Sequence, residues 1–439
     1  MKIPKIGIEK KIIIKELQEA KSNDVNWKNG RSWSLVYYAG EEHTDFLKQV
    51  YNLYFSENAA GPSLFPSLQL MEAEVVSMVA NLLGGDEDTV GTMTSGGTES
   101  ILLAMKAYRD WARESKPHIL IPEILVPASA HPAFLKAGHY FDIKMIQVPL
   151  DTNFQVNISI LKELITENTI CMVASAPTFS QGVMDPVSDM GEIAKSYSIG
   201  LHVDACLGGF MLPFIRKLGY KIPDFDFNVA GVTSISADLH KNAYTAKGAS
   251  AVLYRKASLR RHQFTICTDW QGGIYASPTM MGTRPGGAVA AAWAALKALG
   301  ENGYMDIAQR TMDTTQSLMN GITSLQGLHI LGNPVMSVFA FSSETVDVFS
   351  LGDRLEEKNW YVNRQNNPSS LHMIATQNHF SVIDEFLSDL NKAFKSEQKY
   401  HLKKNIKRSA VLYGGIENIN SSTDPREIAI QRLEKLYSL

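Results

Sequence analysis

Short apolar runs alternate with amphipathic segments along most of the first 300 residues. Apolar residues at helical spacing predict helices, and short β-branched runs bounded by turn residues predict strands. We expect helices over 67–83, 97–111 and 286–299, and strands over 124–126, 143–148, 170–174, 201–204, 232–236 and 249–254. Such alternation is typical of an α/β fold in which helices cover a mostly parallel sheet.

The pattern changes on both sides of this region. Beyond residue 300 it predicts strands over 335–341 and 372–375 and helices over 347–358 and 380–394, as in a smaller α+β domain. The first 56 residues mix charged and aromatic side chains without one clear period. We therefore expect an N-terminal arm over 1–56, a large domain over 57–300 and a small C-terminal domain over 301–439.

Charge and cysteine content exclude several classes of protein. The chain has 42 basic and 45 acidic residues, so no global field favours nucleic acid or an anionic membrane. Its three cysteines lack metal-ligand spacing, which indicates free thiols and no metal site. No apolar run reaches the roughly 18 residues of a membrane span, and no signal-peptide core is present. We expect a soluble, cytoplasmic protein, although a signal for a specialised export machine would escape this scan.

The segment 94–100, Thr-Ser-Gly-Gly-Thr-Glu-Ser, is a candidate phosphate site. Gly96 and Gly97 allow a ligand to approach the backbone closely, and the helix expected after them offers free N–H groups and a positive dipole end. Thr98 adds a hydroxyl donor. The alternative is a tight turn in which Thr98 caps the helix, so the motif alone decides nothing.

One acidic and one basic residue stand at or just after the ends of later strands of the predicted sheet. Asp204 closes the strand 201–204, and Lys241 follows the strand 232–236 directly after His240. A lysine amine forms a Schiff base with the aldehyde of pyridoxal 5′-phosphate, and a carboxylate keeps a proton on the pyridine nitrogen. Asp204 as a helix cap and Lys241 as a solvated side chain are the simpler alternatives.

Two further features extend this candidate site. His131 follows the strand 124–126, where an imidazole is able to stack on a flat cofactor or simply to start a helix. The Gly- and Pro-rich loop 268–287 contains aromatic residues and one arginine, Arg284, which is a candidate clamp for an anion. The joint order of phosphate cup, histidine, aspartate and lysine predicts a pyridoxal-phosphate site at one sheet edge.

This order of motifs resembles that of fold-type I pyridoxal-phosphate enzymes of the group II decarboxylase class, and in particular the sphingosine-1-phosphate lyases. The similarity extends from about Trp27 to about residue 334, and more weakly beyond. It is most specific in Phe65-Pro66 with 72–76, and in the segments 94–108, 201–210, 231–238 and 269–278. The resemblance implies a transferase-like large domain with a pyridoxal-phosphate site, a smaller C-terminal domain and an N-terminal arm.

The resemblance also implies a role for each matching residue. It assigns the cofactor to Gly96, Gly97, Thr98, His131, Asp204, His240 and Lys241, with Gly273 reaching the phosphate from the second subunit of a homodimer. It places the active sites at the subunit interface. Substrate contacts fall on Tyr37, Asn58, Lys247 and Tyr275, to which we add Arg284. The catalytic residues would be Lys241 and Asp204, with Tyr37 and Lys247 as candidate proton relays.

The implied reaction is the retro-aldol cleavage of a phosphorylated sphingoid base. The substrate amine displaces Lys241 to give an external aldimine, a base removes the C3 hydroxyl proton, and a long-chain aldehyde and phosphoethanolamine are released. An amino-acid decarboxylase that uses the same cofactor and a non-catalytic cofactor-binding homologue are the alternatives. The absence of a membrane-spanning segment in this sequence suggests a bacterial-type form of the enzyme.

The chain departs from the family pattern at two places. After Lys241 it continues with Asn242 and Ala243, where the family has an aromatic residue and glycine. Gly61 and Ser63 stand where the family typically has histidine and aspartate. The second departure bears on part of the pocket expected for the substrate phosphate.

Overall fold

The computed structural model describes residues 2–61, 63–401 and 424–437. These residues form two compact units: a large unit of Tyr37–Thr315 with Leu331–Phe339, and a small unit of Met1–Val36, Gln316–Ile330 and Ala340–Leu439. Residues 402–423 of the expected small domain lie outside the described residues. The unit boundaries differ from the expected limits at residues 56 and 300, because the arm is divided between the two units.

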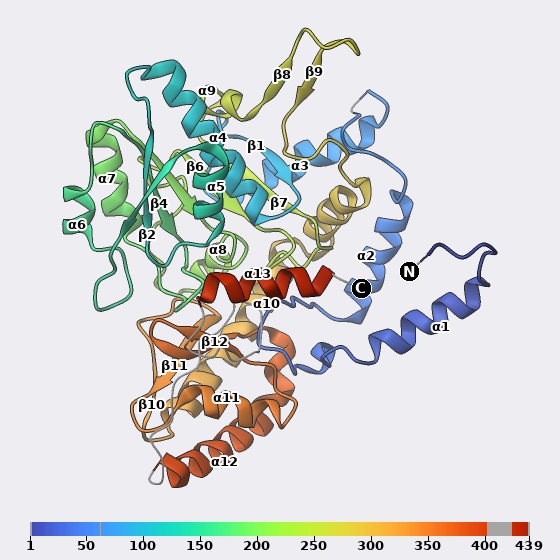
Figure 1. Cartoon of the computed structure of the whole chain (residues 1–439), viewed down its shortest axis with the longest axis vertical. Coiled ribbons are helices and arrows are strands. Elements are labelled where there is room, and N and C mark those ends of the chain that lie inside the picture. Colours follow the sequence, from blue (N-terminus) through green and yellow to red (C-terminus); the bar gives the residue numbers. More distant parts are fainter. Residues whose placement is uncertain (1, 62, 402–423, 438–439) are drawn as a thin grey trace. The chain divides into compact units, whose positions relative to one another are not determined.

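The large unit is built on a seven-stranded sheet with the order β1-β7-β6-β5-β4-β2-β3 (Figure 1). Its strands are β1 (Val90–Thr94), β2 (Glu123–Pro127), β3 (Lys144–Val148), β4 (Thr169–Ser175), β5 (Gly200–Asp204), β6 (Ser234–Ala237) and β7 (Ser250–Tyr254). The neighbouring strands β3, β2, β4, β5 and β6 are parallel to one another, and β7 runs antiparallel to both β6 and β1. The mostly parallel sheet confirms the predicted fold class, and β1 is the one strand of this sheet that the pattern did not predict.

Helices cover the sheet, whose central strands are buried along their whole length. Every residue of β2, β4, β5, β6 and β7 is buried, as expected for a sheet that is covered on both faces. The helices are α2 (Glu41–Leu53), α3 (Pro66–Leu82), α4 (Gly97–Ser115), α5 (Ala133–Phe141), α6 (Ile158–Glu163), α7 (Val187–Tyr197), α8 (Leu212–Lys217) and α9 (Ala257–Arg260). Helix α4 contacts β1, β4, β5, β6 and β7, so it packs against three of the strands that position the site, β1, β5 and β6.

The large unit extends past the expected boundary because of helix α10 (Gly286–Thr323). The backbone leaves helical geometry at Gly300, where φ is 57° and ψ is −177°. Beyond this kink, however, Tyr304 is buried in the large unit, where its hydroxyl donates to the carbonyl of Ala243 at 2.9 Å and its ring stacks on Phe214. The packing of Tyr304 thus extends the large unit past the limit expected at residue 300.

The small unit contains a four-stranded sheet with the order β10-β11-β13-β12. Its elements are α1 (Lys10–Lys21), β10 (Leu328–Ile330), β11 (Val338–Ser343), α11 (Val348–Glu356), β12 (Asn363–Asn366), β13 (Ser369–Ile374), α12 (Ile383–His401) and α13 (Pro425–Tyr437), with short 3-10 helices at Trp27–Asn29 and Gln377–Val382. Trp33 is fully buried among Trp360, Phe386 and His379, which explains why the start of the expected arm belongs to this unit.

A two-stranded hairpin leaves the large unit between β7 and α10. Its strands β8 (Thr265–Cys267) and β9 (Tyr275–Ser277) pair only with each other, and a 3-10 helix, Arg261–Gln263, precedes them. Figure 1 shows the hairpin extending away from the seven-stranded sheet. Among the described residues, no helix is long and apolar enough to cross a membrane.

Candidate active site

The predicted site residues gather at one edge of the seven-stranded sheet. Because β1, β2, β5 and β6 run in the same direction, their carboxyl ends lie at this edge. The segments that follow these four strands carry Gly96 and Gly97, His131, Asp204, and His240 with Lys241, respectively. The fold therefore brings together residues that are up to 145 positions apart in the chain (241 − 96).

The glycine turn before α4 lies directly against the loop that carries the lysine. A Cβ atom on Gly97 would lie 2.9 Å from both carboxylate oxygens of Asp238 and 2.8 Å from Sγ of Cys206. A Cβ on Gly96 would lie 3.3 Å from Cε1 of His240. Thr98 is exposed at the start of the 19-residue helix α4, where free N–H groups favour a phosphate. The turn is therefore packed so closely against Asp238 and Cys206 that only glycine fits at position 97.

Asp204 is held at the end of β5 by neutral donors. Its Oδ1 accepts hydrogen bonds from the N–H of Cys206 at 3.0 Å and from the hydroxyl of Ser236 at 3.3 Å. Two positions earlier on the strand, His202 is fully buried and bonds to Ser234 and Ser236. Burial lowers the pKa of His202 to about 4, so this ring is neutral at pH 7 and supports the strand end. Both of these hydrogen bonds to Asp204 thus fall on the same carboxylate oxygen, Oδ1.

His131 lies between β2 and α5, and its orientation is fixed locally. The N–H of Ala133 donates to Nδ1 of His131 at 3.2 Å. Burial lowers the pKa of His131, while the charge of Asp204 acts in the opposite direction. A neutral, half-buried imidazole in the electrostatic field of Asp204 and Lys241 is suited to lie flat against an aromatic ring.

Lys241 forms an ion pair that the sequence did not predict. Its Nζ lies 3.0 Å from Oδ2 of Asp238, a side chain with only 2% of its surface exposed. The same oxygen is 3.5 Å from Nε2 of His240. Burial is the largest single influence and would lower the pKa of Lys241, but the attraction of Asp238, together with smaller attractions from other groups, raises the pKa above its ordinary value. In the opposite sense, Lys241 holds the pKa of Asp238 well below its usual range despite the burial of the carboxylate.

Lys247 and Tyr37 lie together beside the lysine loop. The ammonium of Lys247 is 5.2 Å from the ring centroid of Tyr37, and it donates to the carbonyl of His240 at 3.1 Å. Partial desolvation and the positive charge of Lys241 lower the pKa of Lys247, although its side chain remains accessible. The two predicted proton relays are therefore neighbours of Lys241 in the structure.

The departure from the family pattern after Lys241 is well packed. Asn242 is buried and donates from Nδ2 to the carbonyl of Leu207 at 2.7 Å, and Ala243 is fully buried. Tyr244 is held at a positive φ of 55°, and its carbonyl is 3.0 Å from Nε2 of His43. The turn after Lys241 is thus held by hydrogen bonds to two separate segments, at Leu207 and at His43.

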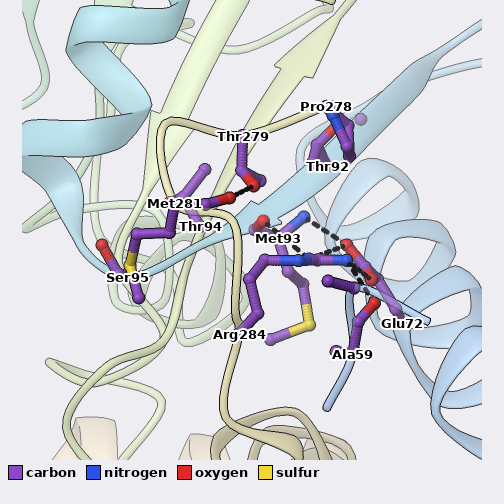
Figure 2. Close-up of polar contacts among 12 residues, drawn as sticks. Ala59, Glu72, Thr92, Met93, Thr94, Ser95, Pro278, Thr279, Met281 and Arg284 are labelled. Carbon is purple, nitrogen blue, oxygen red and sulfur yellow. Dashed lines mark hydrogen bonds and ion pairs between the residues drawn. The ribbon is translucent and has the colours of Figure 1, made fainter. Parts of the chain in front are cut away.

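Arg284 forms a second polar cluster with Glu72 and Ala59, which Figure 2 shows, and Asn58 adjoins it. The guanidinium of Arg284 forms a bidentate pair with Glu72 at 2.8 and 2.9 Å, and it also donates to the carbonyl of Ala59 at 3.0 Å. Asn58 Oδ1 accepts the backbone N–H of Arg284 at 3.0 Å. An anion would have to compete with Glu72 for this arginine, so the structure gives Arg284 a bracing position beside Asn58.

Gly273 and Tyr275 lie on the exposed hairpin, and no contact with the sheet edge is recorded for them within the described chain. Gly273 has a φ of 106°, which side chains rarely adopt, and nothing lies within 4 Å of the position of a Cβ. Tyr275 is 41% exposed. The single chain therefore does not bring these two predicted residues to Lys241.

The comparisons with known proteins agree along most of the chain. Residues 45–344 match the model of the pyridoxal-dependent decarboxylase conserved domain. A sphingosine-1-phosphate lyase of Oryza sativa is 46% identical over 88% of this chain and 73% of its own length, and one of Rattus norvegicus is 41% identical over 99% and 77%. This chain belongs to the sphingosine-1-phosphate lyase family of pyridoxal-dependent enzymes.

Solved structures support the family membership at the level of the fold. A sphingosine-1-phosphate lyase of Burkholderia pseudomallei superposes with a TM-score of 0.91 at 35% identity, covering 100% of this chain and 97% of its own. A glutamate decarboxylase of Lactobacillus brevis, at 21% identity, covers 93% of this chain and 96% of its own with a TM-score of 0.80 and shares the fold. The predicted fold-type I architecture and the predicted cofactor, pyridoxal 5′-phosphate, are confirmed by this membership.

The residues at the sheet edge fit this cofactor. The N-terminus of α4 after the glycine turn suits a phosphate, the carboxylate of Asp204 suits a protonated ring nitrogen, and Lys241 supplies an amine. Sequence reasoning missed Asp238 and Glu72, although both stand in the segments that carry the family resemblance. The signal for Asp238 was its place three residues before Lys241, directly after a predicted strand.

Proposed function

We propose that this protein is an aldehyde lyase that cleaves phosphorylated sphingoid bases to a long-chain aldehyde and phosphoethanolamine. The observation that carries the proposal is the intact sheet edge, with Lys241 and Asp204, in a chain that matches curated sphingosine-1-phosphate lyases at 36–46% identity. A shared cofactor alone would not separate a lyase from a decarboxylase, so the extent of the match decides between them.

The geometry of the edge supports a role for each of the proposed cofactor-binding residues. When bound, the cofactor supplies a protonated ring that accepts the electron pair of the bond that breaks. Asp204 holds the proton on the ring nitrogen, and His131 covers the ring face. Lys241 provides the amine for covalent attachment, while Gly96, Gly97 and Thr98 receive the phosphate, with His240 beside it.

Proton transfer at the substrate falls to the pair beside Lys241. The C3 hydroxyl of the substrate must lose its proton as the Cα–C3 bond breaks, and Cα must then gain one. Lys247 is suited to the first task because its lowered pKa favours the neutral amine, and Tyr37 lies against it. We assign the relay to these two side chains.

Asn58 and Lys247 are our candidates for the substrate phosphate, and Arg284 supports Asn58 from behind. The Glu72 pair leaves Arg284 as a brace for the loop 58–60, whose backbone it binds through Ala59. The alkyl tail would occupy an apolar channel, since each buried CH₂ contributes about 0.8 kcal/mol. Tyr275 would line this channel from the second subunit.

The hairpin supports a homodimeric assembly. Trp270, Ile274 and Tyr275 are 59%, 76% and 41% exposed, and large apolar side chains gathered on a projecting hairpin are typical of an interface. We propose that the hairpin of one subunit carries Gly273 and Tyr275 to the active site of the other. The free thiols of Cys171 and Cys206 are consistent with a reducing compartment such as the cytoplasm.

Product analysis tests the proposed activity. The purified protein, supplied with pyridoxal 5′-phosphate and phosphorylated sphingosine, should release long-chain aldehyde and phosphoethanolamine in equal amounts. Release of CO₂ from amino acids without aldehyde would instead identify a decarboxylase. A protein that binds the cofactor covalently but converts neither class of substrate would be the non-catalytic homologue.

A further inference from the structure

Asp238 is a buried carboxylate that links the two cofactor-binding residues of the lysine loop. Its Oδ2 lies 3.0 Å from Nζ of Lys241 and 3.5 Å from Nε2 of His240. The N–H of Ala249 donates to Nδ1 of His240 at 3.3 Å, so Nε2 is the ring nitrogen that carries hydrogen toward Asp238. The same oxygen of Asp238 therefore lies close to the side-chain nitrogens of both Lys241 and His240.

The glycine turn forms the other wall around Asp238. Both of its oxygens lie 2.9 Å from the position of a Cβ on Gly97, so any larger residue there would displace the carboxylate. Within the described residues, Oδ1 of Asp238 has no hydrogen-bond partner. Asp238 is thus packed between the turn expected to receive the cofactor phosphate and the amine expected to receive its aldehyde.

We propose that Asp238 is a positioning residue that holds Lys241 as an ammonium ion beside the glycine turn and thereby sets the pH range in which this lysine captures the cofactor. The inference rests on the proposed role of Lys241 and deepens it. It concerns the approach of the cofactor to the protein and does not depend on the substrate.

The chemistry of capture explains why the protonation of Lys241 matters. The amine nitrogen must lose its proton before it attacks the aldehyde carbon, and the C=N bond forms as the aldehyde oxygen leaves in a water molecule. No oxidant or reductant is needed. A carboxylate 3.0 Å from the ammonium opposes the loss of this proton, so it delays capture at neutral pH and holds the amine in place.

Other charged groups act on Lys241, but Asp238 dominates. The titratable groups that influence it or respond to it are Asp204, Cys206, Tyr37, His131, His240 and Lys247. Asp204 differs from Asp238 because it accepts hydrogen bonds from neutral donors, the Cys206 N–H and the Ser236 hydroxyl. Asp238 alone among the described carboxylates forms an ion pair with Lys241.

The first test needs no substitution. The cofactor-free full chain is treated with a lysine-reactive acylating reagent at a series of pH values, and the labelling rates of individual lysines are measured by peptide mass spectrometry. Because Lys241 is paired with Asp238 and Lys247 has a lowered pKa, Lys247 should reach half-maximal labelling at a lower pH than Lys241. Labelling of Lys241 at the same pH as Lys247, or at a lower one, would overturn the proposal.

The second test follows cofactor capture by its visible absorbance. In Asp238→Asn the amine should lose its proton at lower pH, and capture at pH 7 should become about tenfold faster for each pH unit by which the profile shifts. Asp185→Asn is the matched control, since Asp185 is also 2% exposed and lies after β4 without a recorded contact to Lys241. A pH profile of Asp238→Asn that coincides with those of the wild type and the control would contradict the assignment. Neither test requires lyase turnover, so a failure here is distinct from a failure of the proposed activity.

Discussion

The sheet edge and the β8–β9 hairpin both carry predicted site residues, but a single chain organises only the first of them. At the edge, Asp204 and Asp238 are 9% and 2% exposed and have recorded partners. On the hairpin, Trp270 and Ile274 are 59% and 76% exposed. The difference is what the proposed homodimer would produce, with the cofactor attached within one subunit and the site closed by the hairpin of a second copy.

Removing the amine at the sheet edge should have the largest effect. Lys241→Ala should lower turnover by about 10³-fold or more, because covalent attachment is lost, and it should abolish the visible absorbance of the bound cofactor. Lys247→Ala is the matched control, and it should keep this absorbance while losing activity. Steady-state kinetics and absorbance spectra measure both effects, and undiminished turnover of Lys241→Ala would remove this residue from the site.

Neutralising the carboxylate at the end of β5 should have the next largest effect. Asp204→Asn should lower kcat by about 10²-fold or more, since a preorganised charge is lost, and it should weaken retention of the cofactor during dialysis. Ser236→Ala, which removes one donor to Asp204 at 3.3 Å, should have a much smaller effect. Normal kcat and normal retention in Asp204→Asn would show that another group serves the ring nitrogen.

A charge on the hairpin should break the proposed assembly and leave the fold of each subunit intact. In Ile274→Asp, a buried charge at the interface should weaken dimerisation by about 30-fold, or ~2 kcal/mol, and activity should fall with the dimer. Leu120→Asp, at a position 89% exposed on the same unit, is the matched control. Analytical ultracentrifugation compares the two variants, and an unchanged dimer in Ile274→Asp would refute a role of the hairpin in assembly.

The smallest effect is expected at Asp185, which accepts the N–H of Ser175 at the end of β4. Burial raises the pKa of Asp185 to about 7, above its ordinary value near 4. The folded state therefore binds this proton more tightly, and the stability it contributes is lost as the pH rises from about 4 through 7. The wild type should therefore lose stability relative to Asp185→Asn as the pH rises. The difference between their Tm values, wild type minus variant, should decrease by about 2–4 °C from pH 5 to pH 8. A difference in Tm that does not change with pH would show that Asp185 does not titrate in this range.

Strand ends were more predictable than the contacts between them. The apolar runs before Asp204 and Lys241 placed both residues at one sheet edge, because parallel strands end on the same side. Strand β1 was missed since its sequence, Val-Gly-Thr-Met-Thr, is neither strongly apolar nor alternating. The pair of Arg284 with Glu72 joins residues 212 positions apart, and no local pattern announces such a contact.

The domain limits could not be read from the pattern for a related reason. Trp33 and Tyr37 are four residues apart, but they belong to different units because of partners near residues 360 and 247. The kink at Gly300 is a local signal, whereas the large unit extends to Thr315 through the contacts of Tyr304. Long-range packing, which periodicity does not encode, decides both limits.

The most direct test of the account is to locate the covalent bond between the protein and its cofactor. The full-length protein, saturated with pyridoxal 5′-phosphate, is reduced with borohydride and digested, and the modified peptide is sequenced by mass spectrometry. The account predicts that the cofactor is attached to Lys241, in the peptide that also contains Asp238 and His240. Attachment to Lys247 or to another lysine, or a fully loaded protein without a reducible bond, would contradict it.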